Sequence, residues 1–253
     1  MDGSSPPLRT IERAFEVIDV LWELNGTGPA ELAKHMDLPK STAHDYLRTL
    51  ASTGYVVRQD GQYQIGHQFL AMGGQLKYRN RLFHIARPEL KKIASETGEL
   101  SNIGIEEDGK CVTLHAVKGT QSLNLGIHSG LITPMHSHAT GKAILAHLPY
   151  EYVHDIIDSE GLEQMTKHTI TDVETLIAEL ETIREDGYAV DWDQQVVGMG
   201  VVAVPILVDD DVLGAVTITC PTDRLKDRTY REELVRALRE AANTIMINYQ
   251  YGH

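Results

Sequence analysis

Residues 38–50, Leu-Pro-Lys-Ser-Thr-Ala-His-Asp-Tyr-Leu-Arg-Thr-Leu, decide how the first part of the chain folds. Pro39 interrupts the segment before it, and Ala43, Leu47 and Leu50 then recur at helical spacing. The pattern predicts a helix from about residue 40 to residue 52 that buries one face and leaves the other polar.

Two more helices and a hairpin are predicted around this segment. Apolar residues recur at helical spacing between residues 10 and 25. They predict one inward face made of Ile11, Ala14, Phe15, Ile18, Leu21 and Trp22. A short helix begins near Pro29, and the β-rich arms of residues 55–65 flank Asp60-Gly61, a pair that favours a tight turn. Three helices followed by a hairpin are the order of a winged helix-turn-helix.

The polar face of the helix at residues 40–52 is the candidate DNA-reading surface. In a helix-turn-helix, the second helix of the pair enters the major groove with its N-terminal half against the base edges. The side chains available for this are Lys40, Ser41, Thr42, His44, Asp45 and Arg48, and the predicted wing adds Arg58, Gln59 and Gln62. An arginine suits guanine or phosphate, and an aspartate suits the amino group of cytosine. The alternative is an ordinary solvated helix face, with wing residues that only form the turn.

The rest of the chain has a different pattern of predicted secondary structure. Residues 67–83 predict a linking helix that Gly73-Gly74 softens. Strand-like runs then follow at residues 101–106, 111–117, 123–128, 188–193, 200–208 and 212–219, mixed with helices. The sequence therefore predicts an α+β protein with a winged helix-turn-helix at residues 1–66, a linking helix at residues 67–84 and a sensor domain at residues 85–253.

The charge is divided unevenly along the chain. Residues 1–84 contain nine Lys/Arg and nine Asp/Glu, whereas residues 85–253 contain 14 against 27, so the net charge of −13 belongs to the second part. The first part is therefore free to approach phosphates. Acidic surfaces also aid solubility in a salty cytoplasm.

The composition also indicates where in the cell the protein is located. Two cysteines predict neither a disulfide framework nor a zinc ribbon. No apolar run approaches the roughly 20 residues of a membrane span. Residues 1–7 lack the basic and apolar regions of a signal peptide. We expect a cytoplasmic protein without a membrane partner.

Several motifs together resemble the IclR family of prokaryotic regulators. They are Leu8-Arg-Thr-Ile-Glu-Arg-Ala-Phe-Glu-Val-Ile18, the stretch at residues 38–50, Gly54-Tyr-Val, Pro134-Met-His-Ser-His-Ala-Thr-Gly-Lys-Ala-Ile-Leu-Ala146, Gly187-Tyr-Ala-Val-Asp191 and Gly198-Met-Gly-Val-Val-Ala-Val-Pro205. The resemblance runs from about residue 8 to residue 249. It implies a winged helix domain, a linking helix that builds a homodimer, and a GAF-like effector domain. It further implies dimers or tetramers that bind near-palindromic operators. With the acidity, it points to a halophilic archaeon as the source.

The second part holds candidates for a small-molecule site. Ala139, Thr140 and Gly141 begin a predicted helix, Asp191 ends a strand, and Thr217 and Thr219 share one strand face. The resemblance implies the same regions as the effector pocket, which would take a catabolic metabolite. The alternative for each residue is a structural role.

This chain departs from the family pattern at two positions. Val201 stands where some acid-sensing relatives carry cysteine, which argues against pyruvate-like ligands. Asp45 stands where relatives commonly carry arginine, so base preference does not transfer.

The expected function is a DNA-binding transcription regulator controlled by a metabolite, without a cofactor. One alternative is an architectural DNA-binding dimer whose second domain only dimerises. Another is a ligand-converting enzyme, but no Gly-x-Ser-x-Gly elbow or phosphate loop is present. His128, His136, His138 and Cys220 are zinc-type ligands without a local metal-binding spacing, so we expect no metal.

Overall fold

The computed structural model describes residues 8–209 and 211–252. The first seven residues, which carried the expectation about a signal peptide, lie outside the described part. The chain divides into two compact units, one up to Leu76 and one from Lys77 onward. No helix of the described part is both long and apolar enough to cross a bilayer.

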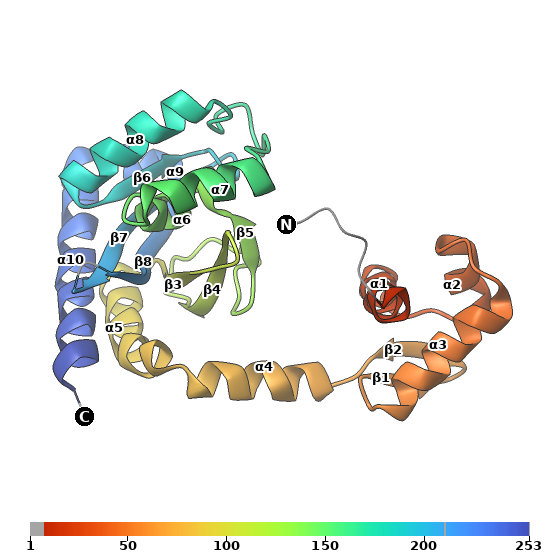
Figure 1. Ribbon diagram of the computed structural model, residues 1–253. Coiled ribbons are helices and arrows are strands. Elements are labelled where there is room, and N and C mark those ends of the chain that lie inside the picture. The colour runs from red at the N-terminus through yellow and green to blue at the C-terminus, as the bar shows by residue number, and fades with distance from the viewer. Residues whose placement is uncertain (1–7, 210, 253) are drawn as a thin grey trace. The chain divides into compact units, whose positions relative to one another are not determined.

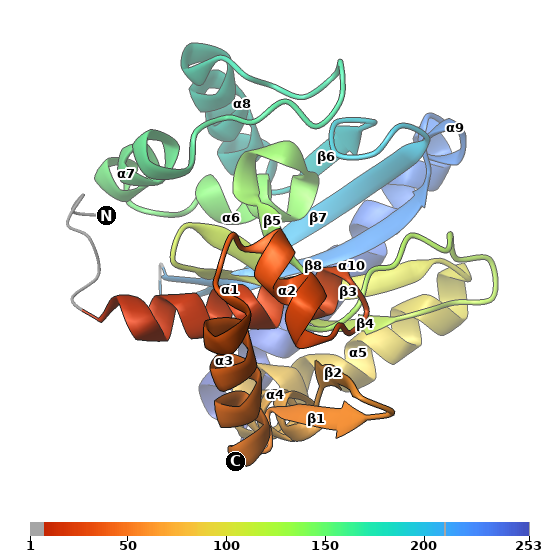
Figure 2. The same ribbon diagram turned by 90° about the vertical axis from the view of Figure 1, so that its right-hand side faces the viewer.

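The first unit is a winged helix-turn-helix, as predicted. Its elements are α1 (Arg9–Glu23), α2 (Pro29–His35), α3 (Lys40–Ser52), β1 (Val56–Gln59) and β2 (Gln62–Ile65). The two strands form an antiparallel hairpin beside α3 (Figure 2). Val17, Leu21, Leu32, Leu47 and Val56 meet in one apolar core. The helix period read from residues 38–50 thus gives the observed helix, with Ala43 and Leu47 fully buried.

The predicted inward face of α1 is wrong in part. The core takes Val17, Val20 and Leu21, whereas Ile11, Phe15 and Trp22 are 55, 59 and 76 % exposed. The reason is that α1 carries apolar residues around more than half of its circumference, and this small core covers only one stripe. A second apolar stripe therefore remains on the surface of this unit.

The hairpin turn has the predicted chemistry. Asp60 and Gly61 both have positive φ, 52° and 82°. Two consecutive positive φ values define a tight turn whose twist matches antiparallel strands, and Asp-Gly accepts them at little cost.

The linking segment breaks earlier than the end of the helix predicted at residues 67–83. It consists of α4 (Gln68–Arg79) and α5 (Arg81–Thr97). Asn80 separates them, because its side chain caps α5 by accepting a hydrogen bond from the backbone N–H of Phe83 at 3.2 Å. Gly73 and Gly74 lie within α4 and do not interrupt it.

The second unit is built on one antiparallel sheet. The strands are β3 (Leu100–Glu107), β4 (Lys110–Val117), β5 (Ile132–Pro134), β6 (Ala189–Trp192), β7 (Met199–Val208) and β8 (Asp211–Pro221), in the order β5-β4-β3-β8-β7-β6. The strand predicted at residues 123–128 is wrong. The edge of β4 is taken instead by β5, where Cys111 pairs with Thr133, so the preceding segment has no partner strand.

Helices cover both faces of this sheet (Figure 1). One face packs on α5 and α10 (Arg228–Tyr251). The other packs on α6 (Ala139–Leu145), which follows the short helix η1 (Met135–Ser137) and neighbours α8 (Val173–Asp186). The remaining helices are α7 (Tyr150–Glu160) and α9 (Thr222–Leu225). Alternation along β7 sends Val202 to the α5–α10 core and Val201 to the α6 core. The α+β class is confirmed.

Candidate functional site

The first candidate site is the outer face of α3. Ala43 and Leu47 are buried in the core and fix the rotation of the helix. Lys40, Ser41, Asp45 and Arg48 are exposed as a result, and Thr42 and His44 are half-buried. The structure thus brings the six predicted recognition residues onto the first turns of one helix, where major-groove reading requires them.

The wing is fixed to the helices beneath it. Thr27 makes reciprocal backbone hydrogen bonds with Tyr63 of β2, at 3.0 and 2.9 Å. The guanidinium of Arg58 lies 5.6 Å from the centre of the Tyr63 ring. Arg58, Gln59 and Gln62 are exposed at or near the tip of the hairpin. These contacts hold the predicted wing residues on a rigid support rather than on a loose loop.

The recognition face borders an apolar groove between α1 and α3. Thr42 and Asp45 line this groove together with Ile11, Ala14 and Leu50. Asp45 therefore lies at the boundary between the polar recognition face and the exposed apolar stripe of α1. The prediction from sequence did not find this groove, because it depends on how the two helices pack.

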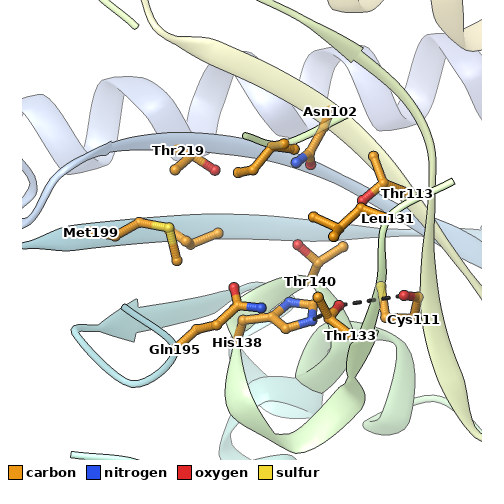
Figure 3. Close-up of a pocket in the computed structure, with 12 residues that line it drawn as sticks. Asn102, Cys111, Thr113, Leu131, Thr133, His138, Thr140, Gln195, Met199 and Thr219 are labelled. Carbon is orange, nitrogen blue, oxygen red and sulfur yellow. Dashed lines mark hydrogen bonds between the residues drawn. The ribbon is translucent and has the colours of Figure 1, made fainter. Parts of the chain in front are cut away.

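The second candidate site is a small pocket in the sensor unit, between the sheet and α6. Its volume is about 30 Å³. The residues that line it are Asn102, Cys111, Thr113, Ile127, Leu131, Thr133, His138, Thr140, Gln195, Met199, Val201 and Thr219 (Figure 3). They come from β3, β4, β5, β7, β8, α6 and the loops beside them.

His138 organises one side of the pocket. Its Nδ1 accepts a hydrogen bond from the backbone N–H of Gly141 at 3.3 Å, so the proton of the neutral ring sits on Nε2. Nε2 then donates to Thr133 Oγ1 at 2.8 Å (Figure 3). Burial, helped by the charge of Lys142, lowers the pKa of His138 to about 3, so the ring is neutral at physiological pH.

The pocket wall carries no formal charge near neutral pH. Burial raises the pKa of the Cys111 thiol to about 12, and the other lining side chains are apolar, hydroxyl or amide groups apart from the neutral His138. Asn102 Oδ1 is buried without a hydrogen-bond partner within the described residues. A buried acceptor without a partner is costly, so this site favours a ligand that donates a hydrogen bond.

The six predicted effector residues converge on this region but play different parts. Thr140 and Thr219 line the pocket. Thr217 lies behind it, with its Oγ1 3.0 Å from Thr140 Oγ1. Strand register places Asp191, Val201 and Thr219 in one row across β6, β7 and β8. Asp191 is fully buried and accepts from the backbone N–H of Gln194 at 2.7 Å.

Ala139 and Gly141 are buried in the first turn of α6. The N–H of Gly141 is already bonded to His138, so it is not available to a ligand in this arrangement.

Sequence reasoning missed Asn102, Thr113, Thr133 and Gln195. A polar residue near the start of a predicted buried strand was the available signal for Asn102. The others needed the register of β3 with β4 and the path of the loops, which residue spacing does not provide.

The zinc-type residues do not assemble. His136 Nε2 bonds to the carbonyl of Glu163 at 3.0 Å, and His138 bonds to Thr133. Cys220 packs in the core on the other face of the sheet from the pocket. Among the described residues no group of three or more His, Cys, Asp or Glu side chains is placed to hold a metal ion.

A winged helix with an exposed recognition face and a separate unit with a small pocket define a ligand-responsive DNA-binding regulator. The comparisons with known proteins give the family. The family model for the IclR helix-turn-helix domain matches residues 10–60, and the model for the bacterial transcriptional regulator IclR C-terminal domain matches residues 76–247. The chain belongs to the IclR family of transcriptional regulators, which are DNA-binding proteins rather than enzymes.

Individual relatives are similar to this protein along nearly the whole chain. The probable HTH-type transcriptional regulator ArcR of Halobacterium salinarum is 30 % identical over 98 % of this chain and 97 % of its own length. The Thermotoga maritima IclR crystal structure has a TM-score of 0.79 at 28 % identity, covering 97 % of this chain and 99 % of that one. An IclR homologue from Microbacterium hydrocarbonoxydans, solved in complex with 4-hydroxybenzoate, has a TM-score of 0.74 at 23 % identity, covering 89 % and 92 %.

Proposed function

We propose that this regulator binds a near-palindromic operator and that a small metabolite in the pocket beside α6 changes its operator affinity. The observation that carries the proposal is the exposed polar face at the start of α3, held in place by buried Ala43 and Leu47. The geometry suits insertion into a major groove.

We assign the DNA contacts by position on the surface. Arg48 and Asp45 reach base edges, because they project together from α3 and both are exposed. Lys40, Ser41, Thr42 and His44 hold phosphates or flanking bases near the helix start. Arg58, Gln59 and Gln62 of the hairpin contact the neighbouring minor groove or backbone.

We assign the effector to the pocket that Thr140 and Thr219 line, with Asp191, Thr217, Ala139 and Gly141 supporting its wall. A pocket with several convergent polar groups and an unpaired Asn102 oxygen supports a ligand site over a purely structural core. An architectural dimer without an effector would not need these convergent polar groups in a pocket. The effector is a small catabolic metabolite, in keeping with the 4-hydroxybenzoate complex of the Microbacterium relative.

We propose a homodimer, able to pair into a tetramer, in a high-salt cytoplasm. The exposed stripe of Ile11, Phe15 and Trp22 supports self-association of the DNA-binding unit. Functionally we divide the chain into residues 1–66 for DNA binding, 67–84 for linking and dimerisation, and 85–253 for the effector. The two compact units, which meet between Leu76 and Lys77, support this division.

Selection of genomic DNA fragments by the purified protein tests the proposal. We expect a near-palindrome with half-sites about one helical turn apart. Arg48→Ala should weaken binding by about 1–3 kcal/mol and relax base preference at one position of each half-site.

Arg236→Ala is the matched control, because Arg236 is an exposed arginine on α10 in the other unit. It should leave both affinity and base preference unchanged. Failure of the wild-type protein to enrich any fragment at low or high salt would contradict sequence-specific binding.

A further inference from the structure

The pocket is too small for a metabolite in its present form. Its volume of about 30 Å³ is small for a metabolite, since ligand pockets usually measure about 300–1,000 Å³. A metabolite would fit this pocket better if part of its wall moved outward.

The weakest part of the wall is the segment of residues 123–131, which we call the strap. Ile127 and Leu131 of the strap line the pocket. Within the described part of the chain, no backbone hydrogen bond involves residues 123–127. The other walls are hydrogen-bonded strands and α6. Segments with few backbone hydrogen bonds open locally at low free-energy cost, so residues 123–127 are where the strap opens.

The strap is tied to the last turn of the linking helix. Lys77, in the last turn of α4, donates a hydrogen bond from Nζ to Ser129 Oγ of the strap at 2.9 Å. The same Nζ lies 3.0 Å from His115 Nδ1 on β4 and 4.7 Å from the centre of the Phe83 ring. Phe83 is buried in the core of the unit. Lys77 therefore joins a fixed anchor to the strap.

His115, the acceptor on β4, keeps one protonation state near neutral pH. Burial, with the charges of Lys77, Arg87 and Lys91, lowers the pKa of His115 to about 4. The imidazole is neutral at physiological pH and accepts from the ammonium group. Ser129 and His115 are thus acceptors for one donor.

Backbone hydrogen bonds link the tie to the pocket interior. The backbone of Thr113, whose side chain lines the pocket, donates to the carbonyl of Leu131 and accepts from Gly130, both at 2.8 Å. His115 lies two residues further along the same strand. A ligand that displaces Leu131 therefore also moves Ser129, which lies two residues away in the chain.

We propose that the strap opens to admit the effector and that Lys77, through Ser129, transmits its position to α4. This inference rests on the proposed function, since it assigns the route by which pocket occupancy reaches the DNA-binding unit. Lys77 is a positioning residue and touches neither DNA nor effector. A strap held open by a ligand loses the Ser129 contact, which releases the end of α4.

The thiol of Cys111 reports strap opening without any effector. Cys111 is 2 % exposed and lines the pocket, whereas Cys220 is fully buried in the opposite core. Both thiols are protonated when buried, because burial raises each pKa to about 12. Alkylation of Cys111 therefore requires local opening, and Cys220 serves as the internal reference.

The experiment measures alkylation of both thiols by iodoacetamide in the full-length protein, resolved by peptide mass spectrometry. Lys77→Met keeps the apolar stem near Phe83, and Ser129→Ala removes only a hydroxyl. We expect each variant to speed alkylation of Cys111 roughly tenfold, the value of one charged hydrogen bond. Alkylation of Cys220 should stay unchanged.

Lys226→Met is the matched control, because Lys226 is an exposed lysine whose Nζ donates to Asp223 at 2.9 Å. It should alter neither thiol. An unchanged rate at Cys111 in both variants would overturn the tie. An equal acceleration at Cys111 and Cys220 would mean global loss of stability and would also overturn it.

A second arm adds an operator duplex recovered by genomic selection. By reciprocity, a strap coupled to α4 must respond to DNA, so the operator should change the Cys111 rate roughly fivefold or more in the wild type and much less in Lys77→Met. Operator binding without any change at Cys111 would overturn the coupling but leave the DNA-binding proposal intact. If no duplex binds, the proposed function fails, while the first arm still decides the tie.

Discussion

At the residue scale, two carboxyl groups near the pocket have opposite surroundings. Asp191 is fully buried, and burial raises its pKa to about 7 although the Gln194 N–H and the charge of Lys142 oppose the rise. Asp193 is half-buried, and hydrogen bonds from Thr222 and the N–H of Gly198 lower its pKa. Asp191 and Asp193 are only two residues apart, yet the pKa of the first is raised and the pKa of the second is lowered.

Asp191 should make stability depend on pH. Its folded-state pKa lies above its ordinary value of 3.8, so the folded protein keeps a proton that the unfolded chain has released. Its contribution therefore falls as pH rises from about 4 to about 7 and stays low above that. Asp191→Asn should raise the melting temperature by roughly 3–10 °C at pH 8, and by little at pH 4.

Asp193→Asn is the control of opposite sign. The lowered pKa of Asp193 stabilises the folded state above its ordinary range, and that contribution disappears as pH falls through the folded pKa. This variant should lower the melting temperature at pH 8 and have a smaller effect at pH 4. Equal effects of the two substitutions at pH 8 would contradict the assignment of charge states.

At the element scale, α1 presents two apolar stripes but has only one core. Val17, Val20 and Leu21 face that core, while Ile11, Phe15 and Trp22 remain exposed within the unit. The exposed stripe continues into the groove that borders Asp45. An apolar stripe of this kind is costly in water unless a partner covers it.

Phe15→Glu should therefore separate the DNA-binding units of the proposed homodimer. We expect operator affinity to fall at least tenfold, because two heads on one operator lose their mutual contact. Binding isotherms on the palindrome and on a single half-site measure this effect. Asp19→Asn, an exposed residue of the same helix, should have no effect. An equal loss on the half-site would argue for a direct DNA role of α1 instead.

At the scale of the whole molecule, charge is segregated along the chain. The first 84 residues are neutral, and the remainder carries the entire net charge of −13. Like charges on one unit repel each other, and salt screens that repulsion because the Debye length shrinks from about 10 Å at 0.1 M to about 3 Å at 1 M.

Stability should therefore increase with salt. Raising KCl from about 0.1 M to about 2 M should raise the melting temperature of the effector unit by several degrees. Scanning calorimetry of the full chain in both buffers measures this change. A melting temperature that falls or stays constant would show that self-repulsion is not a limiting term.

Most of the DNA-binding unit follows from short-range signals in its sequence. Local signals set its parts: Pro39 and the period of Ala43 and Leu47 give α3, and Asp60-Gly61 gives the hairpin turn. These are short-range effects, in which backbone propensity and one small core agree. The same signals predicted which side of α3 is exposed, because a helix with one buried side has only one other side to expose.

The pocket and the free stripe of α1 depend instead on packing between distant segments. Asn102, Thr133 and Gln195 meet only through strand register and loop paths, and the strap loses its predicted strand because β5 takes the edge of β4. Each of these outcomes depends on which of several suitable neighbours is close in space. Residue spacing reports what a segment prefers, whereas competition between distant segments for one edge or one core is settled only in the folded chain.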